Sequence, residues 1–553
     1  MHAMSLTGMM VVLLSLFGAA VLPHEMKTRL CLPFAKLAKR HPVGSLAAIV
    51  TLLLVARLCC LPVLPKPTPI IPDEHSNLFL AQTLAAGRLA NPAHPMGSHF
   101  ETLFILQRPA YASVYPPVQG AFLATGLVLF HQPWAGVLVS IAAMCTAIVW
   151  MLRAYMTRLW ALYGGVLAGA GFAVLSYWTN SYWGGAGAAV GGALVFGAFP
   201  RILSTGRRRH EAVLGLGLII LANSRPYEGL LAVLPAAFCL ALHFSRKTPG
   251  RVNALRSQPP VLIFVILAGA ILTGCYNWRV TGSPFHLPHS SYMQQYAASP
   301  AFVWQRPEVA PEYRDRVLRD AHLSFGIDYS EYSTFTGAAR MSFRKLARVA
   351  VFYWGPLWPL VLLVLPEFMR ERRFRTVLFS VALCLAGILL TVGFQVHYAA
   401  PCTSIFILLL TDTFRRLRRQ WPWAGGVLAI AAPLAWMGTQ ALHLREPRPL
   451  NSLHFRPTIQ ASIAAKPGRH VVFVHYSPSH PLGEEWVYNE PDIDRSQIVW
   501  ARDLGRQINR ELVHYYPDRT FWLLEPDYAE PRLSRCTPEC TPPQDGLPPS
   551  LGH

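Results

Sequence analysis

Long apolar runs separated by short polar segments occupy most of the chain up to about residue 445. The first clear run, 43–64, is long enough for an α-helix to cross a bilayer. Several later runs are shorter than the roughly 20 residues that a lone spanning helix needs, which predicts broken or tilted helices. The pattern predicts an α-helical polytopic membrane domain over 43–445, with about 11 to 13 transmembrane helices. The later runs cover about 118–131, 134–152, 160–176, 185–199, 212–222, 226–243, 259–275, 349–366, 376–394, 399–411 and 424–443.

Beyond residue 445 the pattern changes to short strands and one amphipathic helix, on which Ile508 and Leu512 share a face. These elements predict a small soluble α/β domain over 446–535 and a disordered tail over 536–553. The strands are expected at 470–476, 497–503 and 520–524, and the helix at 507–516.

The N-terminal segment, 1–42, is open to two interpretations. Its apolar stretch over 6–21 could be an extra span or a signal-like segment. Alternatively the start is over-long, since Lys36, Lys39 and Arg40 are typical of a cytoplasmic N-terminus. These basic residues place the beginning of the 43–64 span inside.

Composition agrees with a membrane protein. Of 553 residues, 52% are hydrophobic and only 14% are charged, whereas about a quarter of a soluble protein is charged. The net charge of +20 does not indicate nucleic-acid binding, because much of the Arg and Lys falls in short loops between apolar runs, as the positive-inside rule predicts. Among the ten cysteines, only Cys536 and Cys540 are close enough in sequence to suggest a disulfide, and a metal site would need more ligands.

The basic clusters set the predicted topology. A first outer loop over 65–115, a second over 276–348 and the C-terminal domain then lie outside the cytoplasm. One conflict remains: if 118–131 and 134–152 both span, Arg153 falls outside, so either the pair is a re-entrant hairpin or the rule fails there. The clusters expected in the cytoplasm lie at 207–209, 246–247, 370–375 and 415–419.

The most informative stretch follows the first span. Asp73 and Glu74 come just before an amphipathic pattern in which Leu80 and Leu84 share one face, so both carboxylates lie at the start of a helix near the membrane surface. Asp73 could simply cap that helix after Pro72. Alternatively, one carboxylate is a catalytic base at the outer face, because an acidic pair is costly to hold near a membrane unless it is used.

Other outer segments combine basic and aromatic residues. Arg and His can pair with a phosphate, and aromatic faces can stack on a sugar. Acidic groups opposite basic ones suit a reaction with a hydroxyl nucleophile and a phosphate leaving group. The outer segments contain Asp73, Glu74, His75, Arg108, Tyr115, Asn180, Tyr182, Trp183, Arg225, Tyr227, Glu228, Tyr276, Arg279, His286, His289, His397 and Tyr398.

The chain resembles the GT-C superfamily of membrane glycosyltransferases, which includes protein O-mannosyltransferases and the aminoarabinose transferase that modifies lipid A. The resemblance rests on the 43–64 span, the Pro72-Asp73-Glu74-His75 loop with its interfacial helix, Tyr115-Pro116-Pro117 before the next span, and the motif from Ser224 to Gly229. It covers about 43–445, and the C-terminal domain is similar to that of a bacterial subgroup.

The resemblance implies an inverting transfer from a polyprenyl-phosphate-linked sugar donor to a glycan, lipid or protein acceptor. It places the enzyme in the bacterial inner membrane, among membrane lipids, with the site and the C-terminal domain extracytoplasmic. Asp73 is then the base, with Glu74 as the alternate. A divalent cation is possible, but three consecutive ligands, Asp73, Glu74 and His75, rarely supply a full octahedral set. The residues expected to bind substrate are His75, Arg108, Tyr115, Arg225, Tyr227, Glu228, Arg279, His397 and Tyr398.

Simpler interpretations stay open. Arg225 could be a topological anchor and His397 a plain interfacial residue, while Asn180 and the Gly184–Gly185 pair could serve helix packing. A secondary transporter or lipid flippase is the alternative function, although it would more often show internal repeats and polar residues at mid-membrane. A catalytically inactive envelope scaffold is a third. The discriminating observation is whether the structure brings Asp73 near Arg225 and His397.

Overall fold

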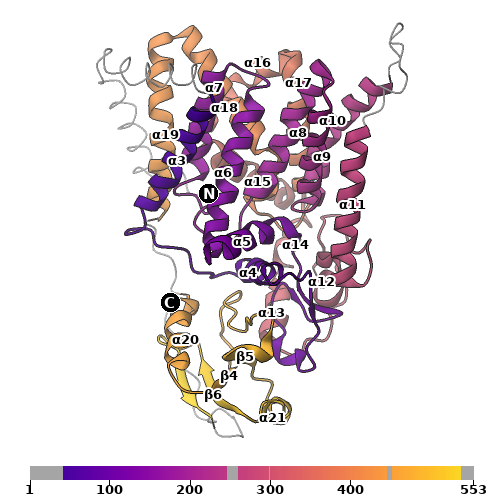
Figure 1. Cartoon of the computed structure of the whole chain (residues 1–553), viewed down its shortest axis with the longest axis vertical. Coiled ribbons are helices and arrows are strands. Elements are labelled where there is room, and N and C mark those ends of the chain that lie inside the picture. The colour runs from indigo at the N-terminus through magenta and orange to yellow at the C-terminus, as the bar shows by residue number, and fades with distance from the viewer. Residues whose placement is uncertain (1–41, 246–259, 298, 325, 445–450, 537–553) are drawn as a thin grey trace.

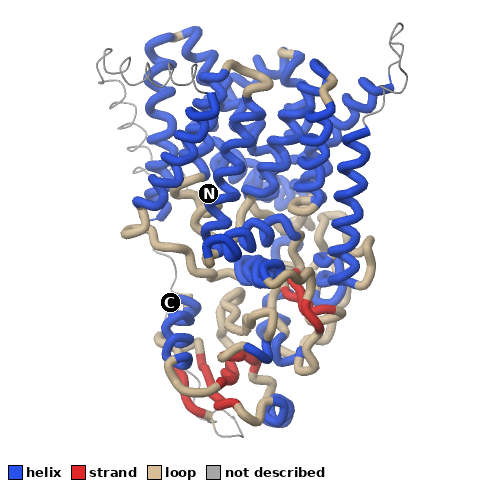
Figure 2. Tube along the Cα trace, viewed as in Figure 1, coloured by secondary structure: helices blue, strands red, loops and turns tan. Residues whose placement is uncertain are grey.

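The computed structural model describes residues 42–245, 260–297, 299–324, 326–444 and 451–536. A layer of long helices stands above a small mixed domain formed by the C-terminal residues (Figure 1). Figure 2 shows that nearly all of the upper part is helical and that strands are confined to the lower part. The predicted fold class is therefore confirmed. The predicted N-terminal segment and tail lie outside the described residues, apart from Pro42 and Cys536, and so does Cys540.

In the described part of the chain, six helical segments are long and apolar enough to cross a membrane. They are α6 (Pro133–Leu152), α8 (Ala186–Thr205), α10 (Pro226–Ser245), α11 (Pro260–Thr281), the pair α15 (Phe335–Trp354) and α16 (Trp358–Arg370), and α19 (Pro422–Leu444). The same layer holds helices that are shorter or less apolar (Figure 1): α3 (Pro42–Cys59), α7 (Arg158–Phe172), α9 (Arg208–Ala222), α17 (Arg372–Leu389) and α18 (Thr403–Gln420).

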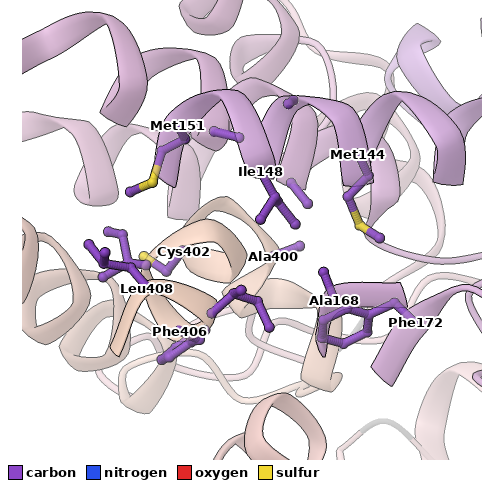
Figure 3. Packing of buried hydrophobic residues seen from close by; sticks show 14 of the residues in the cluster. Met144, Ile148, Met151, Ala168, Phe172, Ala400, Cys402, Phe406 and Leu408 are labelled. Carbon is purple, nitrogen blue, oxygen red and sulfur yellow. The ribbon is translucent and has the colours of Figure 1, made fainter. Parts of the chain in front are cut away.

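Helix α18 forms the centre of the layer. Every residue over 403–414 is buried, and the run 405–410 within it is entirely apolar, as expected for a segment surrounded by other helices. Figure 3 shows its side chains meeting those of α6 and α7 and of the 3-10 turn η4 (Val396–Cys402). Small residues allow close contacts: a Cβ at Gly192 of α8 would lie 1.8 Å from the carbonyl oxygen of Pro401.

Helix α5 (Pro117–Phe130) resolves the topological conflict around Arg153. It has 14 residues, too few to cross alone, and it lies beside α4 (Pro72–Ala85), at the end of the layer nearest the C-terminal domain (Figure 1). Of the two helices, α6 alone is long enough to cross, and Arg153 at its end lines the same pocket as Arg201 and Arg209. The conflict that two full spans would create does not arise, because 118–152 is one short helix followed by one long one.

The outer segments fold onto the layer. The first outer loop contains α4 and a three-stranded sheet in the order β1-β3-β2. The second runs between α11 and α15, and is therefore shorter than the expected 276–348. Its helices are α12 (Pro288–Tyr296), α13 (Arg316–Ser324) and α14 (Ile327–Glu331); the strands of the first loop are β1 (Asn91–Pro92), β2 (Ile105–Leu106) and β3 (Ala110–Ser113).

The C-terminal domain has the expected α/β character. Its sheet has the order β5-β4-β6-β7, in which β4 pairs in parallel with β5 and β6, and β7 pairs antiparallel with β6. The elements are α20 (Arg456–Ala464), β4 (Arg469–Val474), β5 (Ile498–Arg502), α21 (Arg506–Tyr515), β6 (Arg519–Glu525) and β7 (Arg532–Arg535). The three expected strands and the helix are present, whereas α20 and β7 were not predicted.

The C-terminal domain packs directly on the first outer loop. Because side chains alternate along a strand, Val471 and Phe473 of β4 face one side of the sheet, where they share an apolar cluster with Phe79 and Tyr111 of the loop. Val472 and Val474 face the other side, which α20 covers.

Candidate active site

Glu74 holds the beginning of α4 in place. Its Oε2 accepts hydrogen bonds from the backbone N–H of Ile70 at 3.0 Å and of Ile71 at 3.4 Å, and its Oε1 accepts from the N–H of Tyr182 at 3.0 Å. Its side chain is buried. Both carboxylate oxygens are thus occupied by backbone donors, so Glu74 fixes the helix start against the segment between α7 and α8 and is not available to a substrate.

Asp73 has the opposite environment. It is only half-buried, and its Oδ1 accepts a hydrogen bond from the hydroxyl of Tyr115. Burial raises the pKa of Asp73 above its ordinary value, while the Tyr115 hydrogen bond and the charge of Arg225 oppose that rise. A carboxylate with a raised pKa and an accessible oxygen is a better proton acceptor than an ordinary Asp.

Arg225 precedes α10 and lies close enough to Asp73 to influence its pKa. Its guanidinium carbon lies 4.5 Å from the ring centroid of Tyr398, so the group stacks on that ring. Within the described residues, Arg225 forms no ion pair with a carboxylate. A stacked, half-buried guanidinium with no direct ion pair is suited to hold an anionic group from outside the chain.

His397 forms the back of the same region. Its Nδ1 lies 2.9 Å from the hydroxyl of Tyr177, and its ring meets that of Trp183 edge to face at 4.5 Å. Burial, together with the charge of Arg225, lowers the pKa of His397 well below its ordinary value, so the imidazole is neutral at pH 7. Its Nε2 is buried and has no hydrogen-bond partner in the described structure.

His289 at the start of α12 joins this group, although the sequence analysis did not place it among the expected substrate-binding residues. Burial, and after it the charge of Arg225, lower the pKa of His289. The beginning of α12 therefore lies within electrostatic range of Arg225. The sequence did contain a signal for His289, because it is the second residue of a helix that begins with Pro288 in an outer segment.

The structure brings together Asp73, Tyr115, Arg225, His397 and Tyr398, as expected. Glu228 is buried, and its carboxylate interacts electrostatically with the guanidinium of Arg225.

Four other expected residues lie elsewhere. His75 stacks on Tyr488 of the C-terminal domain. Tyr227 donates to the carbonyl of Gly387 at 3.3 Å, and Arg108 and Arg279 are exposed.

The packing interpretation suffices for Asn180 and Gly185. Asn180 Oδ1 accepts from Nε of the buried Arg57 at 2.8 Å. A Cβ at Gly185 would lie 2.5 Å from the ring of Trp178 and 2.6 Å from Ala400. These residues fix the loop behind His397.

The expected cation ligands do not converge. Glu74 is occupied by backbone donors and His75 turns toward the C-terminal domain, so Asp73 is left alone. Over the whole described part of the chain, no group of three His, Cys, Asp or Glu side chains could hold a metal ion. Asp73, Glu74 and His75 therefore do not form a shared cation site in the described structure.

An apolar groove of about 890 Å³ includes Asn223, which lies two residues before Arg225 in the sequence. It runs between α9 and α11 and is lined by Ile219, Asn223, Ile266, Gly269, Trp278 and Phe285. Asn223 and Thr273 also line the groove, and Asn223 Nδ2 donates to Thr273 Oγ1 at 2.8 Å.

No family model and no curated protein matches the sequence. Solved structures with similar folds include ArnT from Cupriavidus metallidurans in the apo state (11% identity, 88% of this chain and 93% of that chain, TM-score 0.48). The same enzyme bound to undecaprenyl phosphate matches with 12% identity, 87% and 93% coverage and a TM-score of 0.47. The Archaeoglobus fulgidus oligosaccharyltransferase complex with Zn and sulfate matches with 11% identity, 86% and 67% coverage and a TM-score of 0.45.

ArnT and the oligosaccharyltransferase are membrane glycosyltransferases of the GT-C superfamily, the one that this sequence resembles. Because the identities are 11–12% and the TM-scores lie below 0.5, we base the function on the residues of this chain.

Proposed function

We propose that the protein is a glycosyltransferase that moves a sugar from a polyprenyl phosphate donor to an acceptor hydroxyl at the outer face of the membrane. The observation that carries this proposal is the pairing of an accessible carboxylate, Asp73, with a nearby guanidinium, Arg225, that has no carboxylate partner in the described chain. Asp73 is hydrogen-bonded to Tyr115, and Arg225 stacks on the ring of Tyr398. Both charged groups can therefore still contact a substrate.

The chemistry assigns one step to each group. Asp73 accepts the proton of the acceptor hydroxyl as its oxygen bonds to the anomeric carbon of the sugar. The bond from that carbon to the phosphate oxygen breaks, and the electron pair leaves with the polyprenyl phosphate. Arg225 stabilises the charge that develops on this leaving group. A single displacement inverts the anomeric configuration.

Two further observations support a lipid-linked donor. The groove between α9 and α11 is apolar, and its lining includes Asn223, two residues from Arg225. A phosphate beside Arg225 could therefore carry a hydrocarbon chain that lies in the groove. In addition, His397 is neutral, so it can donate or accept a hydrogen bond without competing with Arg225 for the anion.

The basic clusters support the proposed sidedness of the site. The 207–209, 370–375 and 415–419 segments lie at helix ends remote from the C-terminal domain, and such clusters face the cytoplasm. Asp73 and the C-terminal domain are then extracytoplasmic.

The test is direct. The purified protein is reconstituted in liposomes with undecaprenyl phosphate carrying a radiolabelled sugar, and the release of undecaprenyl phosphate is measured with a panel of sugar and lipid acceptors. Turnover that requires Asp73 supports the proposal. A donor that binds and crosses the bilayer unchanged would instead identify a flippase.

A further inference from the structure

A second pocket, of about 490 Å³, opens at the opposite end of the helical layer. Helix α6 begins beside the outer segment, where Trp134 Nε1 donates to the carbonyl of Thr179 at 2.8 Å, and it ends 20 residues later at Leu152. The pocket lies at that far end, between the ends of α6 and α8 and the beginning of α9. It is lined by Trp150, Arg153, Arg201, Arg209, His210 and Val213.

Arg201 is fixed in this pocket before any ligand binds. Its Nη1 donates to the carbonyl of Gly197 at 2.6 Å and its Nη2 to that of Trp150 at 2.7 Å, while its guanidinium stacks on the Trp150 ring at 4.2 Å. Gly197 makes this possible, because a Cβ there would lie 2.2 Å from the Trp150 ring. These two bonds use two of the five N–H groups of the guanidinium, so three donors remain.

The charge in the pocket is uncompensated. Arg153, Arg201 and Arg209 all line it, and among the described residues none of the three has a carboxylate within salt-bridge distance. Glu211, the nearest acid in sequence, is buried and does not line the pocket. Three guanidinium groups around one cavity repel each other, and this repulsion favours the uptake of an anion.

We propose that this pocket binds a phosphate group at the cytoplasmic surface of the membrane, most suitably the headgroup of an anionic phospholipid. Arg201 supplies a rigid, partly satisfied fork, which suits the oxygens of a phosphate. Arg153 and Arg209 are exposed and can close around it. Basic pockets between membrane helices on this side are suited to lipid headgroups, and Trp150 and Val213 give an apolar wall. This binding site is separate from the proposed transfer site and does not depend on that chemistry.

The experiment measures thermal unfolding of the purified full-length protein in detergent micelles. Phosphatidylglycerol or phosphatidylcholine is added at equal amounts, and separately sodium phosphate or sodium chloride at equal ionic strength. The test variant carries Arg153→Gln and Arg209→Gln. A charge-matched control carries Arg158→Gln and Arg208→Gln, two exposed positions outside the pocket.

We expect phosphatidylglycerol to raise the wild-type unfolding midpoint by several degrees relative to phosphatidylcholine. The test variant should lose most of that shift and the control should keep it. A comparable shift with sodium phosphate alone would identify a soluble phosphate as the ligand of the same site. No shift in the wild type, or equal loss in both variants, would overturn the proposal, because the effect would then be absent or due to overall charge.

Discussion

His75 and Tyr488 stack face to face across the boundary between α4 and the C-terminal domain, with ring centroids 4.0 Å apart and ring planes 6° apart. Asp73 lies two residues before His75 on the same helix. The C-terminal domain is therefore in direct contact with the first turn of α4, on which the proposed base is placed.

A buried ion pair strengthens this contact. Arg502 of β5 binds Glu485 within the C-terminal domain, and also donates to Asp315 of the second outer loop at 2.8 Å and to the carbonyl of Glu101 at 2.6 Å. One side chain thus joins both outer loops to the sheet. We infer that the C-terminal domain positions the site, and the predictions below separate this role from catalysis.

Asp73→Asn should lower sugar transfer by about 10²–10⁴-fold, the range typical of a general base. The fold should persist, because the amide oxygen can still accept from Tyr115. The measurement combines initial transfer rates with the unfolding midpoint of the purified variant. A wild-type rate would show that Asp73 only begins the helix.

Glu74→Gln is the matched contrast, one residue away. An amide has a single carbonyl oxygen, so it cannot accept from both Ile70 and Tyr182. Leaving a buried donor unsatisfied costs about 1–3 kcal/mol. We expect a lower unfolding midpoint and a moderate fall in rate. A loss of activity as deep as that of Asp73→Asn, at normal stability, would make Glu74 the base.

Tyr115→Phe should move the acid limb of the pH–rate profile to higher pH. The base must be ionised to act, so the rate rises with pH through the pKa of Asp73. The Tyr115 hydrogen bond lowers the pKa of Asp73, so its removal should raise that pKa.

The carboxyl of Asp73 also affects stability. Because its pKa is higher in the folded than in the unfolded state, the folded state binds more protons at pH values between the two pKa values. The free energy of unfolding therefore falls as pH rises through that window.

The measurement for Tyr115→Phe is kcat/KM against pH for wild type and variant. A profile that keeps its midpoint while losing amplitude would assign Tyr115 to substrate contact and not to tuning the base.

Arg225→Lys should impair transfer although the charge is kept, because Lys has neither the planar fork nor the stacking face that Arg225 presents to Tyr398. Transfer is measured against donor concentration. A raised KM would indicate a ground-state contact with the donor, and a lowered kcat at saturation a contact made in the transition state. Unchanged kinetics would return Arg225 to the role of a topological anchor.

Tyr488→Ala should lower kcat and destabilise the protein, because it removes the ring on which His75 rests. Truncating a buried aromatic residue costs about 3–5 kcal/mol. Tyr488→Phe keeps the stack, and it should restore both properties. If Tyr488→Ala unfolds at a lower temperature but transfers sugar at the wild-type rate below that temperature, the C-terminal domain stabilises the site without positioning it.

The sequence by itself determined the classes of structure and the stretch that matters. Apolar runs of near-spanning length predict membrane helices, and the continuous apolar run from Val471 to Val474 is typical of a strand buried on both faces. Asp73 and Glu74 were placed correctly at the start of an interfacial helix, since Pro72 and the apolar spacing after it are local signals.

Only the tertiary structure decided which carboxylate is free and which groups face it. Consecutive residues of a helix point about 100° apart, so Asp73, Glu74 and His75 diverge toward three different neighbours that lie far along the chain. The approach of Arg225 to Asp73 and to His397, like the short α5 that leaves Arg153 beside Arg201, depends on how helices pack. That packing is set by contacts between distant segments, which no local pattern of apolar and polar residues records.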